Sequence, residues 1–110
     1  MTDRVDVTDN PGEGRYDVTL DGKLAGSTFY HDHNGIRSFT HTEINPAYEG
    51  HGLGSQLIRA ALDDTRTRAL AVLPFCPFVR AFIEKHPEYV DLVPEPQRAR
   101  FQLADETSSG

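Results

Sequence analysis

Glycines at every second position of residues 50–54 directly precede a long amphipathic segment, and this junction constrains the possible folds more than any other feature. Apolar residues recur every three or four positions through residues 53–66, which predicts a helix with one buried face. A short apolar run at residues 69–73 then ends at Pro74 and is typical of a strand covered by helices. The predicted buried stripe of the helix is Leu53, Leu57, Ile58, Ala61 and Leu62.

Three extended segments precede the glycines. Residues 16–20 alternate apolar and polar side chains, residues 24–30 continue in an extended pattern, and residues 36–44 form a third such run. The pairs Asp21-Gly22 and Asn34-Gly35 between them are typical of two-residue hairpin turns. The sequence therefore predicts an α+β (α/β) chain, in which an antiparallel meander is followed by a parallel strand-helix-strand unit.

A second helix is expected after the apolar run. Pro77 suits the first position of a helix, and the apolar residues among 78–83 fall on one face. His86-Pro87 ends this helix, and residues 89–93 are expected to form a last short strand. The predicted domain thus has two main helices.

Length and composition indicate one domain, because 110 residues with 37% hydrophobic content suit a single core. Residues 1–15 are polar and broken by Asn10-Pro11-Gly12, so we expect a loose N-terminal lead-in before a domain at residues 16–93. Residues 94–110 are expected to form a polar C-terminal tail. The end of this tail, residues 105–110, carries too little apolar surface to stay ordered.

The charge of the chain limits its partners. The formal net charge is -6 and lysines and arginines do not cluster, so we expect no binding of nucleic acid or of anionic membranes. The longest apolar stretch is far shorter than the roughly 20 residues of a membrane-spanning helix. Because Cys76 is the only cysteine and no signal-peptide core follows Met1, we expect a cytoplasmic protein. The oligomeric state stays open.

The glycine-rich turn before a helix is suited to binding an anion. Glycines let the backbone approach a ligand closely, and the unpaired N–H groups of the helix N-terminus point toward it. A pyrophosphate fits such a turn, although a tight strand-to-helix connection explains the glycines equally well. The spacing differs from the dinucleotide-binding fingerprint, and no Lys-Ser/Thr pair follows as in a P-loop.

The motif Glu49-Gly50-His51-Gly52-Leu53-Gly54 resembles the acetyl-coenzyme A signature of the GNAT acetyltransferases, Gln/Arg-x-x-Gly-x-Gly/Ala. The strings His41-Thr42-Glu43-Ile44, Pro74-Phe75-Cys76-Pro77-Phe78 and Lys85-His86-Pro87-Glu88-Tyr89 are similar to the small branch called N-acetyltransferase-domain-1-like proteins. The resemblance spans residues 16–93.

This resemblance implies a reduced acetyltransferase fold, in which adjacent parallel strands splay apart to admit the pantetheine arm of acetyl-coenzyme A. It implies that the cofactor is held by the following seven residues. They are Glu49, Gly50, His51, Gly52, Leu53, Gly54 and Ser55. Glu49 departs from the family signature, because a basic or amide side chain is usual at the first position.

An acetyltransferase without a covalent intermediate must remove a proton from the acceptor amine. His41 and Glu43 are two apart on one predicted strand, so they share a face at about 6 to 7 Å and could reach one pocket. Either residue could be the catalytic base. The alternative is that both lie on the solvated face of the meander.

Cys76 precedes Pro77 and is therefore expected to cap the second helix, where the helix dipole favours a reactive thiolate. It is a candidate nucleophile, a candidate acid for the leaving thiolate, or a packing residue. In the larger acetyltransferases an asparagine commonly stands here with a tyrosine acid seven residues later. Ile83 occupies that later position in this chain.

Other polar residues are expected to be ordinary surface groups. His31 and His33 flank a hairpin turn without a matching ligand pair elsewhere, so we expect no metal site. Arg80 and Lys85 could contact an adenosine 3′-phosphate, but the simpler expectation is that both are solvated charges.

The sequence thus predicts an enzyme that transfers acetyl from acetyl-coenzyme A to an amine of a small molecule or protein. One alternative is a non-catalytic coenzyme A-binding or sensor module, which the absent tyrosine acid favours. Another is a protein-interaction module that pairs through an exposed edge of the meander.

Overall fold

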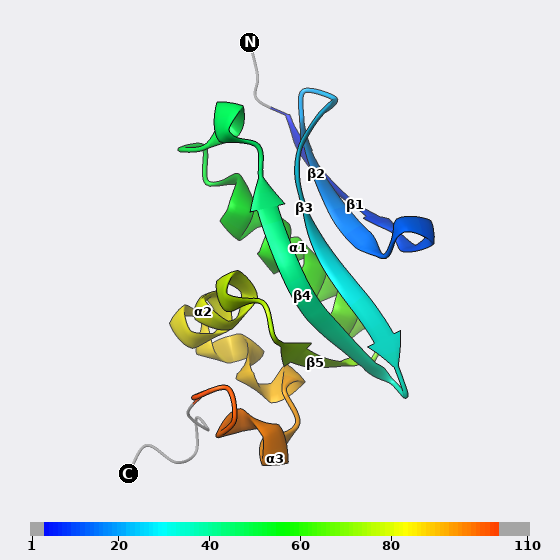
Figure 1. Ribbon diagram of the computed structural model, residues 1–110, viewed down its shortest axis with the longest axis vertical. Coiled ribbons are helices and arrows are strands. Elements are labelled where there is room, and N and C mark those ends of the chain that lie inside the picture. The colour runs from blue at the N-terminus through cyan, green and yellow to red at the C-terminus, as the bar shows by residue number, and fades with distance from the viewer. Residues whose placement is uncertain (1–3, 104–110) are drawn as a thin grey trace.

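The computed structural model describes residues 4–103. Five strands form one sheet in the order β1-β2-β3-β4-β5, in which neighbours in sequence are neighbours in space. The first four strands are antiparallel, and β5 joins β4 in parallel (Figure 1). The strands are β1 Val5–Asn10, β2 Arg15–Leu20, β3 Lys23–His33, β4 Ile36–Ile44 and β5 Ala71–Pro74. The predicted antiparallel meander and parallel strand-helix-strand unit are confirmed.

The two main helices are α1 Leu53–Thr67 and α2 Pro77–Lys85. Helix α1 lies across one face of the sheet, and α2 lies beside it past the end of β5 (Figure 1). No helix of residues 4–103 covers the other face of β2, β3 and β4 (Figure 1). Short helical segments make up the rest of the helical structure within residues 4–103. They are η1 Pro11–Glu13, η2 Pro46–Tyr48, η3 Pro87–Leu92 and α3 Glu95–Arg98.

Both predicted hairpin turns have the backbone conformation that their sequences favour. Asp21 and Gly22 have φ of 52° and 83°, and Asn34 and Gly35 have φ of 51° and 77°. Two successive positive φ angles define a type I′ turn, whose twist matches that of the flanking strands. These turns fix the register of β2 on β3 and of β3 on β4.

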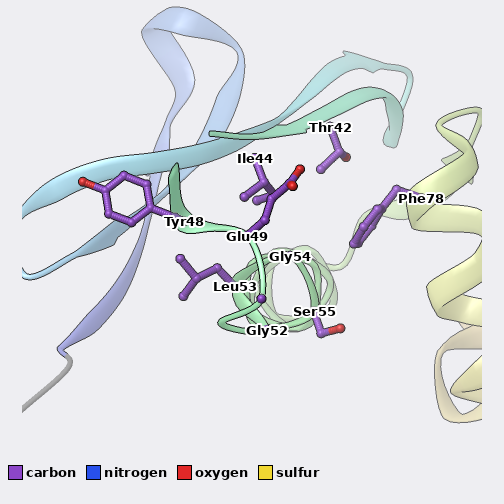
Figure 2. A pocket seen from close by; sticks show the side chains of 10 residues that line it. Thr42, Ile44, Tyr48, Glu49, Gly52, Leu53, Gly54, Ser55 and Phe78 are labelled. Atoms are coloured by element: carbon purple, nitrogen blue, oxygen red, sulfur yellow. The ribbon is translucent and has the colours of Figure 1, made fainter. Parts of the chain in front are cut away.

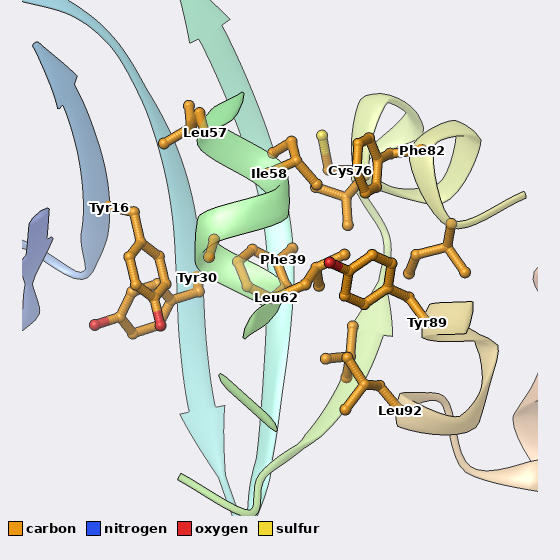
Figure 3. Packing of buried hydrophobic residues seen from close by; sticks show 14 of the residues in the cluster. Tyr16, Tyr30, Phe39, Leu57, Ile58, Leu62, Cys76, Phe82, Tyr89 and Leu92 are labelled. Carbon is orange, nitrogen blue, oxygen red and sulfur yellow. The ribbon is translucent and has the colours of Figure 1, made fainter. Parts of the chain in front are cut away.

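The hydrophobic core lies between α1 and the sheet and extends to α2 and η3. Leu57, Ile58 and Leu62 project from α1, while Phe82 and Tyr89 face them from α2 and η3 (Figure 3). All five residues of the predicted α1 stripe are buried. Burial of such a stripe, at roughly 25 cal/mol per Å² of apolar area, holds a helix against the sheet.

The N-terminal segment is not a loose lead-in. Val5–Asn10 pairs along its whole length with β2, and Val5 and Val7 pack against the core. The predicted loose lead-in was wrong because β1 is an edge strand that buries only one face. The two valines on that face are enough to pack the strand against the core. The turn at 11–14 that separates β1 from β2 ends with Gly14 at a φ of 65°.

The C-terminal part also differs from the sequence prediction. Residues 89–93 form no strand, because Tyr89 N–H and Val93 N–H donate to carbonyls three residues earlier and close the turns of η3. The tail packs back on the core, where Phe101 and Leu103 are buried. The predicted disorder of residues 105–110 lies outside the described residues. Strand β5 is shifted, because Ala69 has a φ of 58° and the strand starts only at Ala71.

Candidate functional site

The candidate site begins where β4 and β5 separate. The two strands pair only from Ile36 with Ala71 to Phe39 with Pro74. Cys76 N–H then donates to Phe39 O at 2.8 Å, and the chain turns away into α2. Because β5 ends here, residues 40–44 of β4 face α2 across a gap instead of pairing with a strand among the described residues.

A cleft of about 370 Å³ occupies this gap. It lies between β4, the N-terminus of α1 and the first turn of α2, with Phe78 and Ser55 on the α2 side and Tyr48 on the other (Figure 2). Ten residues line it. They are Thr42, Ile44, Tyr48, Glu49, Gly50, Gly52, Leu53, Gly54, Ser55 and Phe78.

The backbone of the glycine turn presents donors to the cleft. Gly50 and Gly52 have φ of 90° and 70°, which is the left-handed region that glycine adopts without strain. Gly52 is the N-cap of α1 and has no side chain to satisfy the first amides, and no acidic residue stands in the first turn. The N–H groups of residues 53–55 therefore face the cleft without a capping side chain.

Gly54 allows a close contact between α1 and α2. A Cβ at Gly54 would lie 2.6 Å from Cζ of Phe78, so the bare Cα lets the ring pack against the start of α1. Phe78 is 43% exposed and forms a wall of the cleft (Figure 2). A side chain at position 54 would therefore displace the Phe78 ring from its present position.

Glu49 and His51 occupy different positions around the turn. Glu49 lines the cleft, and its carboxylate extends toward Thr42 beside Ile44 (Figure 2). His51 does not line the cleft but borders a separate cavity with Val5, Leu20 and Gln56. Six of the seven cofactor-binding residues expected from the sequence therefore line the same cleft.

Cys76 caps α2 as expected, but its thiol is buried. The residue is 2% exposed, and Sγ donates to Oγ1 of Thr42 at 3.2 Å. Thr42 Oγ1 also lies 2.8 Å from Thr28 Oγ1, so two hydrogen bonds connect the Cys76 thiol through Thr42 to Thr28 on β3. Of these groups, only Thr42 lines the cleft.

A β-bulge in β4 decides where the two candidate base residues lie. Phe29 pairs with His41 and Tyr30 with Phe39, so Thr40 is an extra residue without a partner on β3. The extra residue inverts the alternation of side chains beyond it. Thr42 and Ile44 therefore face the cleft, whereas His41 and Glu43 face the side of the sheet opposite α1.

On that open side, His41 and Glu43 interact directly. His41 Nε2 lies 3.1 Å from Oε2 of Glu43, and the two side chains are each 63% exposed. The His41 ring stacks on Phe29 at a centroid distance of 5.9 Å. The expectation that the two residues share a face is confirmed, but neither lines the cleft.

The comparisons with known proteins agree with this architecture. The sequence model of the GCN5-related N-acetyl-transferase family matches residues 15–92. The chain belongs to this family. Its fold is similar to the NMR solution structure of a protein from Staphylococcus aureus described as GCN5-like, with a TM-score of 0.62 and 20% sequence identity. That match covers 80% of this chain and 86% of the other. No curated protein matches the sequence.

The cleft of this family member has the features that acetyl-coenzyme A would require. Free amides at an uncapped helix N-terminus suit a pyrophosphate, and the gap between β4 and α2 is lined by apolar Ile44, Leu53 and Phe78 along its walls. Glu49 is the one lining group with the wrong charge for such a ligand. Its carboxylate opposes an anion without blocking the backbone donors.

A second group of polar residues in this family member was not predicted from the sequence. Arg37 on β4 is 4% exposed and binds both carboxylate oxygens of Asp32 at 2.7 Å. It also donates to the hydroxyl of Tyr16, which in turn donates to Asp64 of α1, each at 2.6 Å. Its guanidinium lies 3.9 Å from the ring centroid of Tyr30.

The titration of this Arg37 cluster reflects burial and pairing. Burial and the hydrogen bond to Asp64 raise the pKa of Tyr16 to about 12. The hydrogen bonds from Arg37 lower the pKa of Asp32. For Asp64, burial acts against ionisation, but the hydrogen bonds from Tyr16 and Arg68 hold its pKa below the usual value. The cluster thus favours a charged Arg37 with ionised carboxylates and neutral tyrosines.

Within residues 4–103, no group of three or more His, Cys, Asp or Glu side chains could hold a metal ion. No helix in the same range has the length and apolar character needed to cross a membrane.

Proposed function

We propose that this family member transfers an acetyl group from acetyl-coenzyme A to an amine. The observation that carries the proposal is the cleft at the separation of β4 and β5, which ends at the uncapped N-terminus of α1. The net reaction forms an N–C amide bond, breaks the thioester C–S bond and moves one proton from the amine to the coenzyme A thiol. Acetyl-coenzyme A supplies the activated carbonyl.

The residues that would hold the pyrophosphate are those of the glycine turn. The amides of Leu53, Gly54 and Ser55 would donate to its oxygens, and the positive end of the α1 dipole adds a favourable term. Gly50 and Gly52 keep the backbone open at this place because neither carries a Cβ. The rest of the cleft, between Thr42 and Phe78, would take the pantetheine arm.

We assign His41 as the base and Glu43 as its positioning residue. An ionised carboxylate only accepts hydrogen bonds, so the contact at 3.1 Å places the ring proton on Nε2. Nδ1 of a neutral ring then keeps the lone pair that accepts a proton from the amine, and Glu43 stabilises the imidazolium that results. The acceptor would approach on the open face of the sheet, opposite α1.

Direct transfer fits the position of Cys76 better than a thioester on its own thiol. The thiol is buried and engaged with Thr42, which separates it from the cleft. Its supporting role is to orient the Thr42 hydroxyl. We expect intact-mass measurement after mixing with acetyl-coenzyme A to show no acetyl adduct, in the wild type or in Cys76→Ser. An adduct that only the wild type forms would replace direct transfer by an acyl-cysteine route.

Calorimetry with acetyl-coenzyme A tests the binding site. Gly52→Leu forces a side chain into the left-handed backbone region at the helix N-terminus, so we expect at least a 10-fold loss of affinity. Gly35→Leu is the matched control, because Gly35 also has a positive φ and open space around it but lies in a distant hairpin turn. Equal affinity of folded Gly52→Leu and wild type would reject this site.

Release of coenzyme A across a panel of amines tests catalysis. A general base contributes roughly 100-fold or more, so His41→Ala should lower kcat by about that factor. His33→Ala is the control, since His33 is an exposed histidine at the hairpin tip. Glu43→Gln should give a smaller loss, because the amide still accepts a hydrogen bond but carries no charge.

A non-catalytic coenzyme A-binding protein remains the second candidate. In the larger acetyltransferases a tyrosine acid stands at the position of Ile83. Ile83 is buried in the core and offers no proton. Sustained turnover with any amine would exclude this candidate. Binding by calorimetry with no turnover on the whole panel would favour it.

A further inference from the structure

A smaller cavity adjoins the cleft on its α2 side. It measures about 140 Å³ and lies between the first turns of α1 and the length of α2. Ser55 and Phe78 line both spaces, so the cavity continues the cleft away from β4. Its lining is Ser55, Phe78, Ala81, Phe82, Lys85 and His86, which includes two basic side chains and no carboxylate.

Lys85 is the cation of this region that has no interaction partner among residues 4–103. Among residues 4–103, no hydrogen bond or ion pair engages its ammonium group, and the side chain is exposed at the last position of α2. The neighbouring cations have partners, because Arg80 lies 3.4 Å from Glu84 and Arg59 lies 3.7 Å from Glu88. A free lysine at the wall of a cavity attracts an anion, although the whole chain is acidic.

His86 presents a donor beside Lys85. Its Nδ1 lies 3.4 Å from a guanidinium nitrogen of Arg59. Arginine only donates, so in this contact Nδ1 accepts and Nε2 of the neutral ring carries the proton, while Oε2 of Glu88 lies 3.9 Å from the same Nδ1. The ring is held in place by Phe82, at a centroid distance of 4.3 Å. Lys85 and His86 together therefore offer an ammonium group and an N–H donor to the same small cavity.

We propose that this cavity binds the 3′-phosphate of the coenzyme A adenosine, through Lys85 and His86. The inference rests on the proposed function, because it requires the pyrophosphate at the glycine turn. From there the ligand would extend past Ser55 and Phe78, and the exposed Phe78 ring offers an apolar surface to the purine. Lys85 is exposed, as the expectation of a solvated charge requires, and under this proposal it also recognises the ligand.

The test compares coenzyme A with dephospho-coenzyme A, which lacks only the 3′-phosphate, by calorimetry. We expect the wild type to bind coenzyme A about 10-fold more tightly than dephospho-coenzyme A, because one charge-assisted contact to a phosphate contributes about this much. Lys85→Ala should remove most of this preference while leaving the affinity for dephospho-coenzyme A unchanged. Lys23→Ala is the matched control, because Lys23 is the other lysine of the chain and lies at the β2–β3 hairpin.

The possible results separate the two proposals. Equal affinity of the wild type for both ligands, or an equal loss of both in Lys85→Ala, overturns the 3′-phosphate site and leaves the glycine turn intact. Failure of both ligands to bind the wild type overturns the proposed function and this inference with it. Lys85→Arg should keep the preference, since a cation remains at the position, and loss of the preference there would contradict simple charge recognition.

Discussion

Strand β4 passes from a closed polar cluster at Arg37 to an open cleft at Thr42. At the Arg37 end, guanidinium, phenol and carboxylate groups from β2, β3, β4 and α1 satisfy one another. At the Thr42 end, the polar groups are backbone amides at the start of α1, without side-chain partners. The difference separates stability from binding. Internal partners hold the first end together, and the donors of the second are left for a ligand.

The largest effect is expected at the closed end. Arg37→Leu leaves the hydroxyl of Tyr16 without its donor and Asp32 without its ion pair, so the free energy of unfolding should fall by about 3 kcal/mol. Arg4→Leu removes an exposed ion pair with Asp6 and should change it by less than about 1 kcal/mol. Urea denaturation measures both. Similar stabilities of the two variants would show that the Arg37 cluster contributes little.

Part of the pH dependence of stability should come from the same cluster. The folded protein keeps the pKa of Tyr16 at about 12, above the ordinary value of about 10, so its stabilisation is complete below pH 10 and is lost between pH 10 and 12. Asp32 and Asp64 have lowered pKa values, so their stabilisation is present above about pH 4 and is lost as the pH falls further.

Thermal unfolding from pH 3 to 11 measures both limbs. Tyr16→Phe should reduce the loss above pH 10, and Asp64→Asn should reduce the loss below pH 4. Arg68 also pairs with Asp64, so the lowered pKa of Asp64 does not depend on Tyr16 alone. Unchanged slopes in both variants would contradict the assignment of these limbs to the cluster.

The smallest effect is expected at the open end, where Glu49 places a carboxylate in the cleft. Glu49→Gln removes one exposed like charge, worth about 1 kcal/mol or less, so coenzyme A should bind up to about 5-fold more tightly. Stability should not change. Glu13→Gln, in an exposed turn, is the control. Weaker binding in Glu49→Gln would mean that this carboxylate contacts the ligand favourably.

Sequence periodicity was sufficient for the meander, for α1 and α2, and for the parallel crossover, because each of these depends on residues close together in the chain. The Arg37 cluster has no such local pattern. Tyr16 and Asp64 are 48 positions apart, and a buried arginine has the same sequence pattern as a solvated one. Only the packed sheet brings its members together.

The placement of the candidate site was predictable only in part. The glycine turn was located because its spacing and the following helix are local features. The side of β4 on which His41 and Glu43 lie depends on the bulge at Thr40, which arises from pairing with β3 and has no signature in the strand itself. The alternation of Val5 and Val7 was an available signal for β1 that polar neighbours obscured.

The bulge has a kinetic consequence for the proposed enzyme. One extra residue turns the cleft-lining side chains of β4 to one side and His41 to the other, so in the proposed enzyme the cofactor and the amine would enter from different sides. Neither has to leave before the other arrives, and a ternary complex can form in either order. Double-reciprocal plots at several cofactor concentrations should therefore give intersecting lines, whereas a shuttle of acetyl through the enzyme would give parallel ones.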